Sequence, residues 1–225
     1  MDIDCVLHQD SLPYLAAMPD KSVDVVITDP PYPNGLGLFS EFLIDGIAGL
    51  YLAAKKAKRS VIFFWSPLVD PPQPPPGFFR TATHIWHKPD GKTSIRYETI
   101  HVWSRDYKRQ PYRVFDIPIL EFSTRKDWQE THPTQKPVRL MRYLIEQHTQ
   151  EGDVILDPFA GTGTTGVAAR QLKRHYVLIE TNKEYADFAS ARLAPREATA
   201  PTAIDEAQES ATPAIPSTTT PKARR

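Results

Sequence analysis

The tetrapeptide Asp29-Pro30-Pro31-Tyr32 groups residue types that could act together on a flat molecule carrying an amine. It follows the apolar run of residues 23–28, which is typical of a buried strand in a parallel sheet. An ionised aspartate accepts hydrogen bonds, and the prolines lack N–H donors, which leaves nearby carbonyls to accept as well. Acceptors beside a tyrosine ring suit a planar group with an NH2, such as a nucleobase. The alternative is a strand that simply ends in a proline turn.

A second group of residues, from Asp157 to Gly166, has the composition of a cofactor-binding turn. Three glycines fit the pattern G-x-G-x-x-G between an apolar strand and a helix. Glycines let the backbone approach a ligand, and the helix N-terminus presents free N–H groups. Glu180 lies 19 residues after Gly161, at the end of the next expected strand, where it could bind ribose hydroxyls. The pattern suits a nicotinamide or flavin dinucleotide as well as S-adenosylmethionine, and a glycine turn without a ligand is the remaining alternative.

The elements that must position these residues alternate between strands and helices, which predicts an α/β fold. Seven strands are predicted, at residues 4–8, 23–28, 60–65, 81–87, 98–104, 153–157 and 175–180. Helices are predicted at residues 12–18, 36–57, 135–148, 164–172 and 182–193, with Asn182 as the cap of the last. Gly46 and Gly49 weaken the prediction of one continuous second helix. The proline-rich residues 67–77 predict a stiff loop, either a spacer or a rim over the site.

Composition and charge bound the class of protein. The 225 residues carry 27 basic and 27 acidic groups, which does not favour a strong non-specific binder of polyanions. Residues 84–142 carry a net charge of +5, which predicts either a phosphate-facing surface or an ordinary solvated one. A single cysteine and the absence of a long apolar run indicate a cytoplasmic protein. We expect a catalytic domain over residues 1–194 and, from the Ala, Thr, Pro and Ser content, a disordered tail over 195–225.

Three stretches resemble the motifs of the amino-group DNA methyltransferases that have the beta-type, permuted motif order. They are D-P-P-Y at residues 29–32, H-P-T-Q-K-P at 132–137 and D-P-F-A-G-T-G-T-T at 157–165, with further matches at 85–88 and 97–98. The resemblance covers about residues 4–193 and implies a Rossmann-like, seven-stranded methyltransferase sheet with helices on both faces. It also implies that the strands at 153–157, 175–180, 4–8 and 23–28 are the first to fourth strands of the family's sheet.

The resemblance implies S-adenosylmethionine as cofactor, double-stranded DNA as substrate, a flipped base as target, and no metal. The catalytic residues would be Asp29, Pro30, Pro31 and Tyr32, in which the aspartate and the Pro30 carbonyl accept the amine N–H groups and the tyrosine stacks on the base. The cofactor would contact Asp10, Asp157, Phe159, Ala160, Gly161, Thr162, Gly163, Thr164, Glu180, His132, Thr134 and Lys136. Within that set Asp10 would lie near the adenine amine, Glu180 on the ribose and Lys136 at the methionine carboxylate.

Residues implied for nucleic-acid contact are Tyr32, Trp86, Lys88, Arg105, Lys108, Arg109, Arg113, Arg125 and Lys126. In the family that the chain resembles, D-P-P-Y is typical of adenine N6 and S-P-P-Y of cytosine N4, so the resemblance implies adenine as the preferred target. Residues 105–131 are expected to be mostly loop and are short for a target-recognition region, which predicts a short or relaxed target sequence or a partner that supplies specificity. A homodimer is also open. The alternatives are a methyltransferase acting on RNA or a protein amide, a nicotinamide-dependent oxidoreductase, and a non-catalytic nucleic-acid module.

Overall fold

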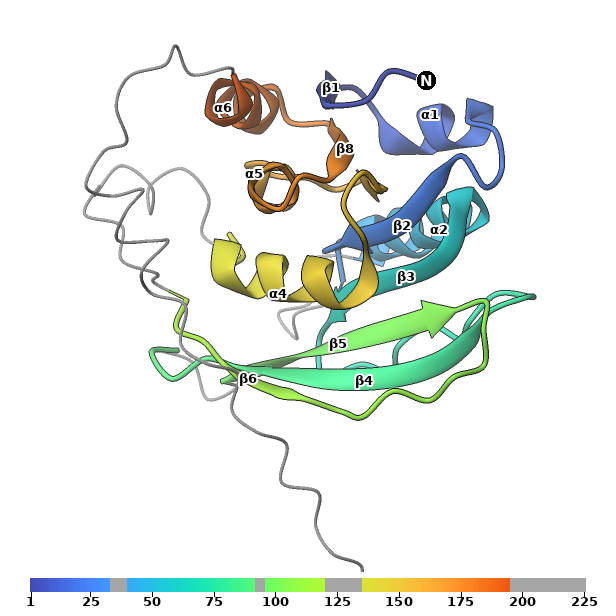
Figure 1. Cartoon of the computed structure of the whole chain (residues 1–225), viewed down its shortest axis with the longest axis vertical. Helices are drawn as coiled ribbons and strands as arrows, with labels where there is room; N and C mark the ends of the chain where they lie inside the picture. The colour runs from blue at the N-terminus through green and yellow to red at the C-terminus, as the bar shows by residue number, and fades with distance from the viewer. Residues whose placement is uncertain (33–39, 92–95, 120–134, 195–225) are drawn as a thin grey trace, which may run out of the picture. The chain divides into compact units, whose positions relative to one another are not determined.

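The computed structural model describes residues 1–32, 40–91, 96–119 and 135–194, and residues 1–193 make one compact unit (Figure 1). Within the described residues a single sheet has eight strands in the order β1-β8-β7-β2-β3-β5-β4-β6. The strands are β1 (Cys5–His8), β2 (Val23–Thr28), β3 (Ala57–Trp65), β4 (Phe79–His87), β5 (Tyr97–Ser104), β6 (Val114–Asp116), β7 (Val154–Asp157) and β8 (His175–Glu180). The helices are α1 (Ser11–Ala17), α2 (Ser40–Lys56), α4 (Val138–His148), α5 (Thr164–Gln171) and α6 (Lys183–Leu193). The predicted tail, residues 195–225, lies outside the described residues.

Every predicted strand is present, and the predicted α/β class is confirmed. Strands β1, β8, β7, β2 and β3 are parallel, whereas β5 is antiparallel to both β3 and β4. The neighbours β7 and β2 come from opposite ends of the chain, as the permuted order implied. The parallel strands therefore carry their carboxyl ends at one edge of the sheet, which is where open α/β sheets bind ligands.

The sheet is buried on both faces, because its central strands alternate apolar side chains between two cores. On one face Val25 and Ile27 of β2 pack with residues of α4 and α5, among them Leu140 and Ala168. On the other face Val26 packs with α1 and α2. Figure 1 shows α4 and α5 on one side of the sheet and α1 and α2 on the other. None of the described helices is long and apolar enough to cross a membrane.

Two predictions about individual elements were wrong. The eighth strand, β6, falls in the segment expected to be loop, and its three residues are too few to show an alternating pattern. Helix α4 begins at Val138 instead of residue 135, because a proline at 137 disfavours helical geometry for the residue before it. The predicted second helix is confirmed as α2, which is continuous through Gly46 and Gly49. A Cβ on either glycine would lie within 3 Å of Pro31 or Phe159, which belong to the two predicted motifs.

The later part of the proline-rich loop after β3 lies against α2, and the choice between a spacer and a rim over the site stays a prediction. The Tyr51 hydroxyl of α2 donates to the Gln73 carbonyl at 3.0 Å. Pro74, Pro75 and Pro76 line a cavity of about 500 Å³ together with Tyr51, Lys55, Phe78 and Arg105. The loop therefore runs back towards Phe79, where β4 begins, at the edge opposite the carboxyl ends of the parallel strands.

Candidate active site

The Asp29 and Asp157 loops meet because β2 and β7 are neighbours. Val26 pairs with Leu156 in the parallel register, and both strands end two residues or fewer further on. The Thr28 hydroxyl then donates to Asp157 Oδ1 at 2.7 Å across a separation of 129 residues. The D-P-P-Y stretch and the glycine loop, read from distant parts of the sequence, thus form one site at the edge where ligands bind.

A buried lysine joins two carboxylates at the centre of this site. Lys136 Nζ lies 2.5 Å from Asp29 Oδ2 and 3.2 Å from Glu98 Oε2, and the lysine side chain is only 8% exposed. Glu98, at the start of β5, is also paired with Lys88, which follows β4. The cluster therefore contains two carboxylates and two ammonium groups.

The other oxygen of Asp29 is placed to accept a hydrogen bond from a ligand. Asp29 Oδ1 is out of reach of solvent and has no hydrogen-bond partner among the described residues. Burial raises the pKa of Asp29, and Glu98 raises it further, while the charge of Lys136 opposes the rise. Burial alone would lower the pKa of Lys136, but Asp29 and Glu98 outweigh it and raise that pKa well above its ordinary value. Lys136 is therefore charged at neutral pH, beside an aspartate with one unused acceptor.

Tyr32 lies beside this cluster and presents a ring fixed by Trp65. Their ring centroids are 5.5 Å apart at 47°, and the Trp65 indole N–H donates to the Val69 carbonyl at 3.1 Å. Burial, followed by the charge of Asp29, raises the pKa of Tyr32 well above its ordinary value. The phenol therefore stays protonated, and a planar group placed next to Asp29 would find an aromatic neighbour.

The glycine loop has the backbone geometry of a ligand cradle. Gly161 and Gly163 have φ values of 52° and 78°, in the left-handed region that favours glycine. A Cβ on Gly163 would lie 2.7 Å from the Cβ of Ala189, so the loop can sit this close to α6 only without a side chain there. The Gly161 N–H donates to Glu180 Oε2 at 2.7 Å. The loop and the predicted ribose-binding carboxylate are therefore in contact.

Asp10 is brought to the same edge by the pairing of β1 with β8. The Gln9 N–H donates to the Glu180 carbonyl at 3.1 Å, and Asp10 Oδ1 caps α1 by accepting from the Leu12 N–H. Two carboxylates and a left-handed glycine turn at neighbouring strand ends fit an adenosine with a ribose diol and an amine. These residues thus fit the nucleoside part of the predicted cofactor.

The Asp157 carboxylate is committed to the protein, which counts against a direct contact with cofactor. Its Oδ1 accepts from the Thr28 hydroxyl and the Phe159 N–H, and its Oδ2 accepts from the Thr165 hydroxyl at 2.5 Å. Burial raises the pKa of Asp157 to about 6, against the opposing effect of these three donors. We conclude that Asp157 joins β7, β2 and α5 and shapes the loop from beneath.

The raised pKa of Asp157 predicts a specific dependence of stability on pH. A carboxyl whose pKa is about 6 when folded and 3.8 when unfolded contributes stability that is full below pH 3.8 and lost as the pH rises through 6. The loss amounts to about 3 kcal/mol. The free energy of unfolding of wild type minus that of Asp157→Asn should therefore fall between pH 4 and pH 8 in urea titrations. A pH-independent difference would contradict this, and Asp45→Asn at an exposed site is the control.

Part of the H-P-T-Q-K-P stretch contacts the glycine loop. The Thr162 hydroxyl donates to Gln135 Oε1 at 3.0 Å, and the next residue is Lys136. Arg192 of α6 supports the loop from the other side by donating to the Thr162 carbonyl at 2.7 Å. The predicted cofactor residues His132 and Thr134 lie outside the described residues.

Comparison with known proteins identifies the family. A family model described as DNA methylase, of the N6/N4 type, matches residues 49–191. The chain belongs to this DNA methylase family. The matched range contains the glycine loop, Glu98 and Lys136, and begins beyond the D-P-P-Y stretch, which the structure nevertheless places beside them.

Named relatives agree with this membership. This DNA methylase is 29% identical over 238 residues to the type II methyltransferase M2.DpnII of Streptococcus pneumoniae, over 84% of this chain and 88% of that protein. It is 28% identical over 239 residues to the type II methyltransferase M2.LlaDCHI of Lactococcus lactis subsp. cremoris, with the same two coverages.

Solved structures share the fold. The M1.HpyAVI–SAM complex superposes with a TM-score of 0.65 at 24% identity, over 85% of this chain and 99% of that one. The cytosine-N4-specific PvuII DNA methyltransferase gives a TM-score of 0.67 at 20% identity, over 86% and 87%. At these identities the likeness shows the fold alone.

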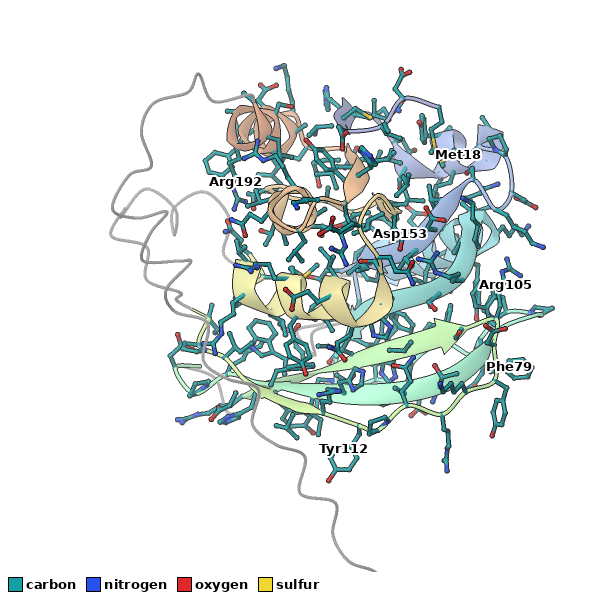
Figure 2. The ribbon with its side chains drawn as sticks, viewed as in Figure 1. Met18, Phe79, Arg105, Tyr112, Asp153 and Arg192 are labelled. Atoms are coloured by element: carbon teal, nitrogen blue, oxygen red, sulfur yellow. The ribbon has the colours of Figure 1, made fainter. Side chains whose placement is uncertain are left out.

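The residues predicted to contact nucleic acid are scattered in this DNA methylase. Trp86 is 2% exposed and donates its indole N–H to the Ile117 carbonyl at 2.8 Å, so its burial counts against a contact with a base. Arg105 donates to the Ala57 carbonyl at the start of β3, at the edge opposite Asp29, where Figure 2 shows it with Phe79. Arg113 binds the Tyr143 hydroxyl of α4 at 2.6 Å.

The other predicted nucleic-acid contacts differ in position. Lys108 and Arg109 are exposed in the segment between β5 and β6. Lys88 and Tyr32 lie at the Asp29 cluster, and the buried ring of Trp86 packs against Lys88 from beneath, with its centroid 4.7 Å from Nζ. Arg125 and Lys126 lie outside the described residues.

Sequence reasoning missed several residues that build the site. Glu98 was noted only as part of a family match, and Trp65, Gln135 and Arg192 were assigned no role. A glutamate at the start of an apolar strand is the signal that could have singled out Glu98, because a carboxylate that becomes buried there requires a cation nearby. Gly46 and Gly49 carried a second signal, since glycines inside an apolar helix often mark a close approach.

Proposed function

We propose that this DNA methylase transfers a methyl group from S-adenosylmethionine to the exocyclic amine of a flipped DNA base, with adenine N6 as the preferred target. The observation that carries the proposal is the unpartnered, buried Asp29 Oδ1 next to the Tyr32 ring. Family membership supplies the substrate class, DNA. S-adenosylmethionine follows from the fit of the loop residues and from its presence in the M1.HpyAVI complex.

The roles of the chain's residues follow from their places. Glu180 would bind the ribose of the cofactor, and Asp10 would lie near its adenine. The backbone of the turn at Gly161 would pack against the cofactor. When bound, S-adenosylmethionine supplies an electrophilic methyl group on a sulfonium. Asp29 Oδ1 and the Pro30 carbonyl would each accept one N–H of the target amine, which turns its lone pair away from the ring. Positioning of this kind is a large source of rate enhancement.

Adenine is preferred over cytosine because the strand end reads D-P-P-Y with an aspartate at 29. Cytosine N4 is the second candidate, since the fold is shared with the cytosine-N4-specific PvuII enzyme. A base of either kind must leave the duplex to reach Asp29, at a cost of about a few kcal/mol that stacking on Tyr32 offsets in part.

Specificity for sequence is proposed to be short or relaxed, or supplied by a partner. Direct reading of several base pairs takes several side chains on a framed element. The described part of residues 105–131 contains β6, which pairs with β4, and Arg113, which donates to the Tyr143 hydroxyl of α4. These residues are used to hold the segment against the sheet. The similarity to type II methyltransferases is consistent with a place in restriction-modification.

The decisive experiment is mass spectrometry of nucleosides from DNA incubated with the protein and S-adenosylmethionine. N6-methyladenine is the expected product, and the Asp29→Ala variant should form it at least about 10²-fold more slowly. N4-methylcytosine would replace the adenine assignment. Methyl groups found only on RNA or protein in parallel incubations, or on no acceptor, would overturn the proposed function.

A further inference from the structure

We propose that Lys136 is a positioning residue for Asp29: its ammonium, held between Asp29 and Glu98, fixes one oxygen of the Asp29 carboxylate and keeps that carboxylate ionised, so that the other oxygen can accept the target amine. The inference rests on the proposed function and departs from the sequence prediction that this lysine serves the methionine carboxylate of the cofactor.

The geometry commits Lys136 to the carboxylates of the protein. Its Nζ contacts Asp29 Oδ2 at 2.5 Å and Glu98 Oε2 at 3.2 Å. The same ammonium lies 4.9 Å from the centre of the Phe64 ring and 5.8 Å from that of Trp86. Two carboxylates and two aromatic rings therefore surround the cation, and its side chain is 8% exposed.

Backbone structure explains why the lysine is held so firmly. Gln135 is tied to Thr162 of the glycine loop, and Pro137 caps the start of α4 in an extended conformation. The backbone of Lys136 is therefore held between two anchored neighbours, and only its side chain has to be ordered for the contact with Asp29. A lysine on a free loop would pay a larger entropic cost for the same contact.

The Asp29 and Glu98 carboxylates face two ammonium groups only while Lys136 is present. Facing Asp29 are Lys136, Glu98 on β5, Lys88 after β4, Tyr32 in its own loop and Asp157 on β7. Without Lys136, Asp29 would be a buried carboxylate with a second carboxylate close by, and it would take up a proton. A protonated carboxyl is a poorer acceptor for the target amine. Asp29 therefore depends on the cation for its role.

Removing the charge of Lys136 and removing the charge of Glu98 should shift the pKa of Asp29 in opposite directions. Lys136→Met removes the attractive charge, so the pKa of Asp29 should rise. Glu98→Gln removes the repulsive charge and leaves Lys136 to Asp29, so that pKa should fall. A purely structural role for the cluster would lower activity in both variants without moving their pH profiles in opposite senses.

The test compares the pH profile of single-turnover methyl transfer with the calorimetric affinity for S-adenosylmethionine. For Lys136→Met we expect a rate about 10²-fold lower at pH 7, an acid limb moved to higher pH, and a cofactor affinity within about threefold of wild type. For Glu98→Gln the limb should move to lower pH, and Lys136→Arg should restore part of the rate. Lys58→Met, which removes an ammonium that is 49% exposed at the far edge of the sheet, is the matched control.

Two results would overturn the proposal. One is a Lys136→Met protein that binds S-adenosylmethionine much more weakly and has an unshifted acid limb in its pH–rate profile. That result would assign Lys136 to cofactor binding instead. The other is a pair of limbs that move together in Lys136→Met and Glu98→Gln. If Lys136→Met does not fold, the Glu98→Gln variant tests the proposal alone, and an acid limb that does not move to lower pH would overturn it. If wild type transfers no methyl, the proposed function fails separately, and carbon-13 NMR titration of Asp29 in the free variants still tests the inference.

Discussion

Asp29→Ala is expected to bind S-adenosylmethionine as wild type does and to transfer methyl groups at least about 10²-fold more slowly. The substitution removes a buried carboxylate oxygen that has no hydrogen-bond partner among the described residues, and with it the acceptor for the target amine. Lys136 keeps its contact with Glu98, so the cation is not left alone. Labelled-methyl transfer in single turnover measures the rate, and titration calorimetry measures the cofactor affinity.

The control for this experiment is Asp45→Ala on α2, which removes a carboxylate at an exposed position. A companion variant, Asp29→Asn, keeps the shape of the side chain and removes its charge, and it should fall between alanine and wild type. Turnover at the wild-type rate in Asp29→Ala would remove this residue from the mechanism. Loss of cofactor binding would show that the substitution disturbs the glycine loop as well.

Gly46→Ala is expected to impair both stability and methyl transfer, although glycine-to-alanine changes normally strengthen helices. In an open helix the change stabilises by about 1 kcal/mol. Here the new Cβ would lie 2.3 Å from the Pro31 carbonyl oxygen and 2.9 Å from Pro31 Cγ, so helix or loop must move. Overpacking of this kind costs about 1–3 kcal/mol and exceeds the gain in helix propensity.

A shift of Pro31 should also slow methyl transfer, because Pro31 lies between Asp29 and Tyr32 in the chain. A displacement of about 1 Å at a reacting group can cost about 10²-fold in rate. We therefore expect Gly46→Ala to lower the turnover rate by about 10- to 100-fold, with a lower midpoint in urea. Asp45→Ala, one residue earlier and exposed, again serves as control. A Gly46→Ala protein that is more stable and fully active would contradict the close contact.

What the sequence predicted well was local. The strand ends at Asp29, Asp157 and Glu180 follow from short patterns, and so does the cap at Asn182, whose Oδ1 accepts from the Glu184 N–H at 2.9 Å. Each pattern needs only neighbours along the chain. The resemblance then added the relation between the distant motifs, which the adjacency of β2 and β7 in the sheet agrees with.

What could not be predicted depends on contacts between distant residues. Lys136 meets Asp29 across 107 residues, and no spacing rule relates them. Trp86 has the composition of a stacking residue, but β4 turns it into the core. The sequence alone shows only the low helix propensity of Gly46. In the structure the position requires a glycine because the backbone of Pro31 lies against it. Tertiary packing outweighs local preference at each of these positions.

The first strand and the last described helix of the catalytic unit lie together. Strand β1 pairs with β8, the Asp4 N–H donates to the Tyr176 carbonyl at 2.7 Å, and α6 packs beside β1 (Figure 1). A short covalent bridge between these neighbours would close the unit into a ring, and the ring could be cut at a surface loop without changing any contact around Asp29. We therefore expect a circularly permuted gene of this kind to encode the same arrangement of residues around Asp29.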